Sequence, residues 1–316
     1  MLYKNSIKVL FSNFVNVWKA ILYFMLIVAL SGFLIFLCIN SIFKMLQDSG
    51  LFNDVATIYS DFLTNLNLTE LFASIGEIIN SVVDTIIRKF SDIWLSFFGI
   101  IFVILFLSVF ISNLTIMPMC NSINYYMGSL VKNGYWNSFF DTFVKNLNIQ
   151  FVAYFVTLPI KLLIGVFVYF SFSLFNYSWV ISVLAVILLV GGYVLLSAFK
   201  YTLFATWIPT YVITDYSIFK SLKLSIKNVF KQFLRVYGCA VGVVLTIICL
   251  NFFLGMFTLL VGLLVSIPMS YLLYSSFGMV TAYECQGMRY YVDVYNVITP
   301  MKKEMKDKLE DLKFVV

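Results

Sequence analysis

Long apolar runs without any charged residue dominate the chain. The first covers residues 20–43, and about 20 apolar residues are enough for a helix to cross a bilayer. It is too long for the apolar part of a cleaved signal peptide, so we expect it to remain as the first span. A second charge-free run lies between Asp92 and Lys132, and it predicts a span over residues 93–118.

The charge-free stretch between Lys161 and Lys200 is too long for one crossing, so we expect a turn within it. Residues 175–178, with the sequence FNYS, are the best candidate for this turn. They define the third and fourth spans, at residues 149–175 and 178–206. The alternative turn, Gly191-Gly192, would bring Lys161 to the membrane interface but would bury the polar residues of FNYS.

The last apolar run, residues 236–283, would be about 72 Å long as a single helix, so it predicts two crossings. We place the turn between Leu254 and Gly262, which gives spans at residues 236–256 and 260–283. The sequence therefore predicts an all-α integral membrane protein with six transmembrane helices.

Three related stretches lie ahead of the apolar runs and predict an internal repeat. Ser6–Trp18, SIKVLFSNFVNVW, aligns without a gap to Ser225–Tyr237, SIKNVFKQFLRVY, and Val144–Val152, VKNLNIQFV, matches less closely. We predict three hairpins of two spans, each preceded by a cytoplasmic amphipathic helix lying on the membrane surface. In the third copy apolar residues share one helical face, and the opposite face carries four lysines, Lys220, Lys223, Lys227 and Lys231.

Two further segments lie outside the predicted spans. The loop at residues 44–92 carries seven acids and an apolar stripe at helical spacing, so we expect one or two amphipathic helices outside the cytoplasm. Its stripe predicts either a cap packed over the spans or a docking surface for a protein partner. Residues 301–316 predict a short helical tail in the cytoplasm, because their apolar residues share one helical face.

Basic residues are distributed unevenly between the predicted loops. With the amino terminus inside, 17 Lys and Arg lie on the cytoplasmic side and three lie outside, so we expect both termini in the cytoplasm. A chain that is 62% hydrophobic and 11% charged is not an ordinary soluble domain. The net charge of +6 follows from these cytoplasmic bases, so we expect no nucleic-acid partner.

The sequence offers few groups for catalysis or metal binding. It has no histidine, which excludes His-ligated metals and His-based catalysis. Its five cysteines lack CxxC spacing and predict neither a disulfide framework nor a zinc site. Nucleotide-binding and common hydrolase motifs are also missing from the sequence. We therefore expect no enzyme activity, no cofactor and no metal.

Lys161 is the charge that lies deepest in a predicted span. Counted from Phe175, it is about 21 Å from the outer surface and about 9 Å from the inner one. Its side chain can extend to the inner interface from there, and a role in binding a substrate or ion is the alternative. The other candidate residues would contact anionic lipids of the inner leaflet, each gaining about 1 kcal/mol: Lys220, Lys223, Lys227, Lys231 and Arg235.

The stretch Trp207–Gly238, WIPTYVITDYSIFKSLKLSIKNVFKQFLRVYG, combines a proline at a span exit, an aspartate and a basic amphipathic helix. It resembles a bacterial six-span membrane family that includes the membrane domain attached to some glycerophosphodiester phosphodiesterases. The resemblance implies a multi-pass protein of the bacterial cytoplasmic membrane. It supplies no catalytic residues, and without a soluble catalytic domain it implies no phosphodiesterase activity.

These features predict a non-enzymatic membrane protein that interacts with lipids or with a protein partner, in an accessory, scaffold or immunity-like role. The expected partners are anionic lipids of the inner leaflet and a protein at the acidic outer loop. The rival hypothesis is a transporter or permease subunit, which would require a polar cavity between the hairpins.

Overall fold

The computed structural model describes residues 2–48, 50, 53, 55–58, 60, 64, 80–81, 83–174 and 179–300. These residues are almost entirely helical, which confirms the predicted all-α class. The strands among the described residues form a short antiparallel hairpin in which Tyr290 pairs with Ile298. The predicted FNYS turn, the tail at 301–316 and about half of the predicted outer loop, including residues 65–79, lie outside the described residues.

Five helices in the described ranges are long and apolar enough to cross a membrane: Val15–Asp48, Tyr135–Ser173, Val183–Thr214, Phe233–Phe257 and Leu263–Gln286. A sixth apolar stretch, Ile93–Phe102, is shorter. The apolar window of Tyr135–Ser173 is only 11% buried, whereas that of Leu263–Gln286 is 61% buried. The last helix is thus the core, and the other helices expose apolar surface as lipid-facing helices do. The long apolar helices and their exposed apolar surface support a helical membrane protein.

The chain forms two compact units, residues 1–25 with 113–316 and residues 26–112. The first unit begins with α1 (Leu2–Ser12) and the start of α2 (Val15–Asp48). It continues with α7 (Ile116–Ser129), α8 (Tyr135–Ser173), α9 (Trp179–Phe204), α10 (Trp207–Thr214), α11 (Ile218–Phe230), α12 (Phe233–Phe257), α13 (Leu263–Gln286), β1 (Tyr290–Tyr291) and β2 (Val297–Ile298). The second unit contains the rest of α2, α5 (Phe90–Phe102), the π-helix η1 (Val103–Ser108) and most of α6 (Val109–Asn113).

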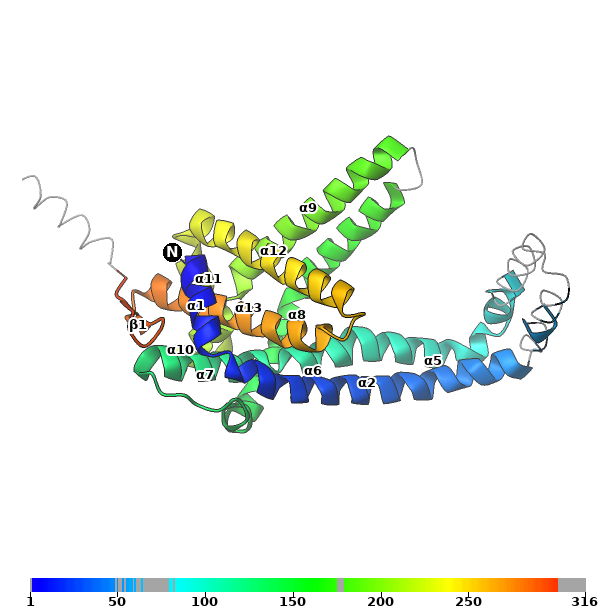
Figure 1. Ribbon diagram of the computed structural model, residues 1–316, viewed down its shortest axis with the longest axis horizontal. Coiled ribbons are helices and arrows are strands. Elements are labelled where there is room, and N and C mark those ends of the chain that lie inside the picture. The colour runs from blue at the N-terminus through cyan, green and yellow to red at the C-terminus, as the bar shows by residue number, and fades with distance from the viewer. Residues whose placement is uncertain are drawn as a thin grey trace, which may run out of the picture. The chain divides into compact units, whose positions relative to one another are not determined.

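Helix α13 is the centre of the first unit, because α1, α7, α10, α11 and α12 all pack against it (Figure 1). Small and polar residues make this close packing feasible, since they let helix backbones approach one another. They include the buried residues Ser270, Ser275, Ser276, Gly278 and Thr281. A Cβ added to Gly278 would overlap the carbonyl oxygen of Ala205, so only glycine fits at this crossing.

In the second unit α2 and α5–α6 run antiparallel. Ser108 donates a hydrogen bond to Ser31 at 2.9 Å, and nearer the other end Cys38 lies against Gly99. The hydroxyl of Ser108 also lies 2.9 Å from the carbonyl oxygen of Val103, five residues earlier, within the π-helical turn. The second predicted span is therefore not one regular helix, since it runs through α5, η1 and α6 into the start of α7.

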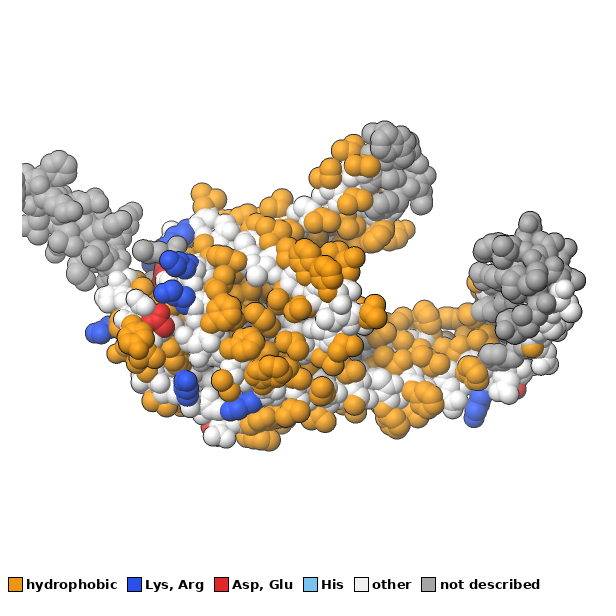
Figure 2. Space-filling model, in the orientation of Figure 1, with side chains coloured by type: hydrophobic (Ala, Val, Ile, Leu, Met, Phe, Trp, Pro, Cys, Tyr) orange, Lys and Arg blue, Asp and Glu red, His pale blue; other side chains and the backbone are white. Residues whose placement is uncertain are grey.

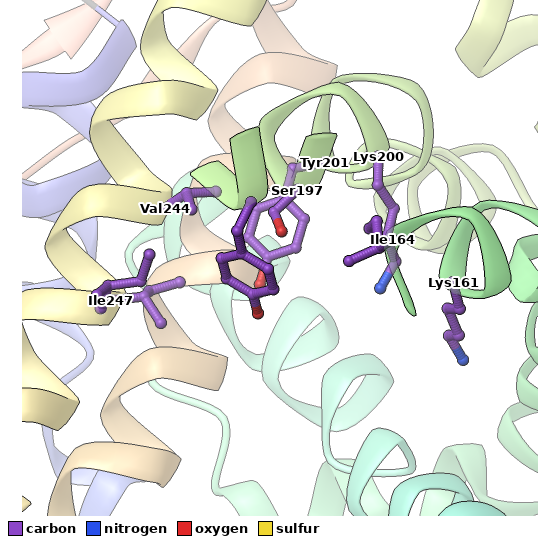
Figure 3. A pocket seen from close by; sticks show the side chains of 9 residues that line it. Lys161, Ile164, Ser197, Lys200, Tyr201, Val244 and Ile247 are labelled. Atoms are coloured by element: carbon purple, nitrogen blue, oxygen red, sulfur yellow. The ribbon is translucent and has the colours of Figure 1, made fainter. Parts of the chain in front are cut away.

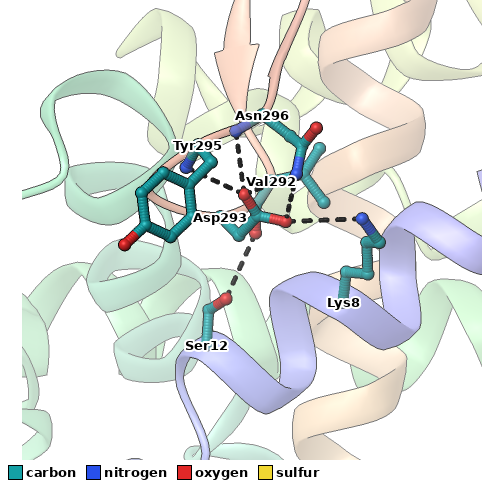
Figure 4. A network of polar contacts seen from close by, with 6 residues as sticks. All are labelled: Lys8, Ser12, Val292, Asp293, Tyr295 and Asn296. Carbon is teal, nitrogen blue, oxygen red and sulfur yellow. Dashed lines mark hydrogen bonds and ion pairs between the residues drawn. The ribbon is translucent and has the colours of Figure 1, made fainter.

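The hairpin after α13 is tied to α1 by polar contacts (Figure 4). Ser12 donates to the carbonyl oxygen of Val292 at 3.2 Å, and the Lys8 ammonium lies 3.3 Å from the Asp293 carboxylate. Asp293 also accepts hydrogen bonds from Asn296 and from the backbone of Tyr295. These donors, the Asn296 side chain most of all, hold the pKa of Asp293 below its usual value.

Candidate functional site: two helix junctions and a two-lysine cavity

Two of the three related stretches form a helix, a break and a second helix. Helix α1 ends at Ser12 and α2 begins at Val15, whereas α11 ends at Phe230 and α12 begins at Phe233. When the two sequences are aligned, these breaks fall within one residue of each other. We call the α1/α2 and α11/α12 breaks the terminal junctions.

Side chains at equivalent positions of the terminal junctions have similar surroundings. Phe11 stacks on Phe14 with ring centroids 6.5 Å apart, and the equivalent pair, Phe230 and Phe233, stacks at 5.7 Å. Three positions are buried in both copies: Ser6 and Ser225, Leu10 and Val229, Val17 and Val236. Val9, Asn13 and Asn16 are buried in the first copy alone. The sequence match between these copies therefore corresponds to a match in local structure.

The middle stretch, residues 144–152, behaves differently because it lies inside the unbroken helix α8. Phe151, the equivalent of Phe233, is 52% exposed and packs on Phe155 of its own helix. Continuing the alignment without a gap places Phe143 where the terminal copies have Ser6 and Ser225. The middle stretch therefore does not share the helix break of the terminal junctions.

Helix α11 packs on the protein through a stripe of small residues. Ser221, Ser225 and Val229 are buried, and the hydroxyl groups of Ser225 and Thr206 are 2.5 Å apart. On the predicted apolar face Val229 is buried, and the other members within α11 are half-buried: Ile218, Leu222 and Ile226. Beside that face, Phe219 and Phe230 are 66% and 58% exposed. Exposed apolar and basic side chains therefore share the outward surface of this helix.

All four candidate lysines of the third copy are exposed: Lys220, Lys223, Lys227 and Lys231. The Lys220 ammonium lies 3.8 Å from the centre of the Tyr216 ring, in cation–π geometry. On the face of the first unit seen in Figure 2, basic side chains gather around α1, α11 and the hairpin. The predicted basic face of α11 is therefore accessible along its length.

Arg235 differs from these lysines because it takes part in a polar network. Its guanidinium is 2.7 Å from the carboxylate of Glu284, which is only 8% exposed. The other oxygen of Glu284 accepts a hydrogen bond from the Tyr290 hydroxyl at 3.0 Å, and Asn5 donates to that hydroxyl at 3.0 Å. Burial raises the pKa of Tyr290 above its ordinary value, so its hydroxyl stays protonated as a donor.

The sequence pattern does not predict this network. Arg235 is predicted to contact lipid headgroups, but the structure gives its guanidinium a carboxylate partner on α13, and the network joins α1, α12 and α13. Glu284 directly follows the last apolar run, and an acid at that place was a signal for an intramolecular partner.

A cavity of about 230 Å³ lies between α8, α9 and α12, and two lysines line it (Figure 3). The lining residues follow helical spacing on each helix: Lys161 and Ile164; Tyr193, Ser197, Lys200 and Tyr201; Val244, Ile247 and Ile248. Lys161 is half-buried, and its ammonium lies 4.4 Å from the centre of the Tyr154 ring. In Figure 3 the side chains of Lys161 and Lys200 extend toward the same side of the cavity.

The sequence makes Lys161 a candidate site residue, whereas Lys200 only marks the end of a charge-free stretch. The structure brings both residues to one cavity, because α8 and α9 pack side by side. A polar stripe along α9 was the available signal, since Tyr193, Ser197 and Tyr201 recur every four residues within an apolar run.

The cavity combines two cations and three hydroxyl groups, a set suited to holding an anion. Within the described ranges, no group of three or more His, Cys, Asp or Glu side chains is placed to hold a metal ion.

The chain was compared with protein-family models, with curated proteins and with solved structures, and none of the three comparisons gave a match.

Proposed function

We propose that the protein is a non-enzymatic, multi-pass protein of the bacterial cytoplasmic membrane that binds anionic lipids of the inner leaflet through α11. The outward surface of α11 carries this proposal, because its exposed lysines lie beside the exposed rings of Phe219 and Phe230. Aromatic and basic residues on one helix surface are the combination that holds a helix at an anionic interface.

Six spans belong to the proposal, and two observations support them. Residues 90–113 are helical without a break through α5, η1 and α6, a length of about 35 Å, which would cross the ~30 Å of hydrocarbon. The five longer apolar helices supply the remaining spans. The similar terminal junctions support hairpins preceded by amphipathic helices, and we propose that the middle hairpin has lost its break.

Cysteine labelling tests the orientation, which rests on the 17 to 3 distribution of bases. In a background without native cysteines, Lys223→Cys should react with a membrane-impermeant maleimide only after the cells are opened. Thr64→Cys, in the predicted outer loop, should react in intact cells. The reverse pattern would invert the proposed topology.

Lipid binding is tested with the purified full-length protein in nanodiscs containing anionic or zwitterionic lipid. Anionic lipid should raise the melting temperature of the protein, and neutralising all four exposed lysines of α11 to Gln should remove most of that increase. Each lysine contributes about 1 kcal/mol to attraction by an anionic surface. An unchanged increase in the four-lysine variant would reject α11 as the lipid-binding element.

A transporter or permease subunit is the second candidate, and the cavity between α8, α9 and α12 favours it, because polar side chains line it. Under the predicted hairpin assignment, it lies between the second and third hairpins. Alternating access would make Ser197→Cys reactive from both sides of the membrane. An accessory protein should expose that position to one side at most.

The predicted partner at the acidic outer loop and the resemblance to the phosphodiesterase-associated membrane family both stay predictions.

A further inference from the structure

Charge is the unusual property of the cavity between α8, α9 and α12. It brings together Lys161 and Lys200, and within the described part of the chain neither lysine forms an ion pair. Two like charges near apolar walls repel each other and have lost part of their hydration. An anion bound between them would offset both costs, so the cavity is electrostatically prepared for a negatively charged ligand.

The hydroxyl groups of the cavity narrow the class of anion. Tyr193, Ser197 and Tyr201 lie on one face of α9 over two helical turns, and each hydroxyl can donate a hydrogen bond. A ligand with several negatively charged acceptor oxygens would use both the ammonium groups and these donors. Phosphate has this character, and lysine is a common phosphate-binding residue.

The volume of the cavity and its apolar wall residues limit the size of the ligand that it can enclose. The cavity measures about 230 Å³, whereas pockets that enclose drug-sized molecules measure about 300–1,000 Å³. It therefore has room for a headgroup but not for a complete lipid. Ile164, Val244 and Ile248 form apolar parts of its wall, and exposed leucines flank Lys161 along α8. Acyl chains of a bound lipid would find apolar helix surface outside the cavity.

We infer that this cavity binds one phosphate group, neutralised by Lys161 and Lys200 and hydrogen-bonded by the hydroxyl groups of α9. The phosphate belongs either to the headgroup of a membrane lipid or to a free phosphate ion. The inference deepens the proposed interaction with anionic lipids and rests on it, but it uses residues separate from those of α11. Its failure and the failure of the α11 proposal are therefore distinguishable.

The test is calorimetric titration of the full-length protein in an uncharged detergent. The probes are dioctanoyl phosphatidic acid, dioctanoyl phosphatidylcholine and inorganic phosphate. We expect one equivalent of phosphatidic acid to bind, and Lys161→Gln or Lys200→Gln to raise its Kd about tenfold or more, because a charged hydrogen bond is lost. Lys200→Arg, which keeps the charge, should restore most of the affinity.

Matched variants separate the cavity from the rest of the protein surface. Lys132→Gln removes an exposed lysine that lies outside both the cavity and α11, and it should leave the Kd for phosphatidic acid unchanged. Tyr201→Phe keeps the shape of the lining but removes one donor, and it should raise the Kd about three- to tenfold. Thermal unfolding of each variant without ligand shows whether it is folded. If a lysine variant is unfolded, the Tyr201→Phe variant still tests the inference.

Each result decides the inference. Equal affinity in wild type and in the lysine and tyrosine variants would overturn it, and so would the absence of binding by every probe. Tighter binding of phosphatidic acid than of inorganic phosphate would identify a lipid headgroup, and the opposite order would identify a free phosphate ion. If the cavity variants lose phosphatidic acid while neutralising α11 leaves lipid stabilisation intact, the inference stands and the α11 proposal fails.

Discussion

The terminal junctions and the middle stretch differ at several positions, including one that is buried in both junctions. Where α1 and α11 fold back onto the protein, Ser6 and Ser225 are fully buried against neighbouring helices. The middle copy has Phe143 at the equivalent position, and α8 continues without a break. Small residues allow two helices to approach closely, whereas a phenylalanine keeps them apart. The comparison indicates that a small residue at this position favours a break after the helix.

Placing the middle-copy residue in the third copy tests this interpretation most strongly. Ser225→Phe should lower the free energy of unfolding by about 4 kcal/mol, because it overpacks a buried site and leaves the Thr206 hydroxyl without its partner. Unfolding in mixed micelles measures the loss. Lys227→Phe, on the exposed side of α11, is the control. Equal stability of the two variants would remove the serine position as the explanation.

The next largest effect concerns helix α13, on which both α1 and α11 pack. Gly278→Ala should cost about 2–3 kcal/mol, because the added methyl group meets the backbone carbonyl of Ala205. Gly238→Ala has open space around its new methyl group and should be neutral or stabilising by about 0.5–1 kcal/mol. Hydrogen exchange should show α11 loosening more than α1, since Gly278 faces the α10 side. Equal loosening of both helices would contradict the asymmetry.

A smaller effect is expected from the network that links the terminal junctions. Glu284→Gln removes the charge paired with Arg235 and should cost about 1 kcal/mol, because the guanidinium is half-exposed and water can solvate it. A double-mutant cycle with Arg235→Gln isolates the pair energy. Additive losses would mean that the ion pair contributes nothing to stability.

The smallest effect distinguishes Lys8 from its equivalent, Lys227. Lys8 pairs with Asp293, while Lys227 forms no ion pair in the described part of the chain. Because the folded pKa of Asp293 is lowered, its contribution is present above the unfolded pKa and is lost as pH falls through the folded pKa. Acid should therefore loosen α1 from the hairpin without loosening α11, as measured by hydrogen exchange. Asp293→Asn should abolish that acid-dependent difference.

Long apolar runs without charge were enough to predict the helical class, because backbone groups in apolar surroundings must form their hydrogen bonds within the segment. The ungapped match of Ser6–Trp18 with Ser225–Tyr237 accompanies a helix break at nearly the same aligned position. The continuity of α8 was not predictable from the same pattern, because the decision to break depends on what the preceding helix packs against. A local motif contains no information about that partner.

The candidate site was only partly predictable for a related reason. Lys161 could be identified from the sequence, because a charged side chain within a membrane span carries a free-energy cost and its position in the span follows from the sequence. Its association with Lys200 depends on how α8 and α9 pack, and the pairing of Arg235 with Glu284 depends on how α12 and α13 meet. Side chains from separate helices come together through tertiary packing, which hydrophobic spacing does not encode.

The position of α1 against α13 has a consequence for synthesis. Asn5 and Tyr290, which share a hydrogen bond, are 285 positions apart, and a ribosome adding about 5–20 residues per second needs roughly 15–60 s to make the chain between them. During that interval α1 has no final partner for the buried face that includes Leu2, Val9 and Leu10. The first helix translated is therefore among the last to reach its native place, and the membrane surface or a chaperone must shelter it meanwhile.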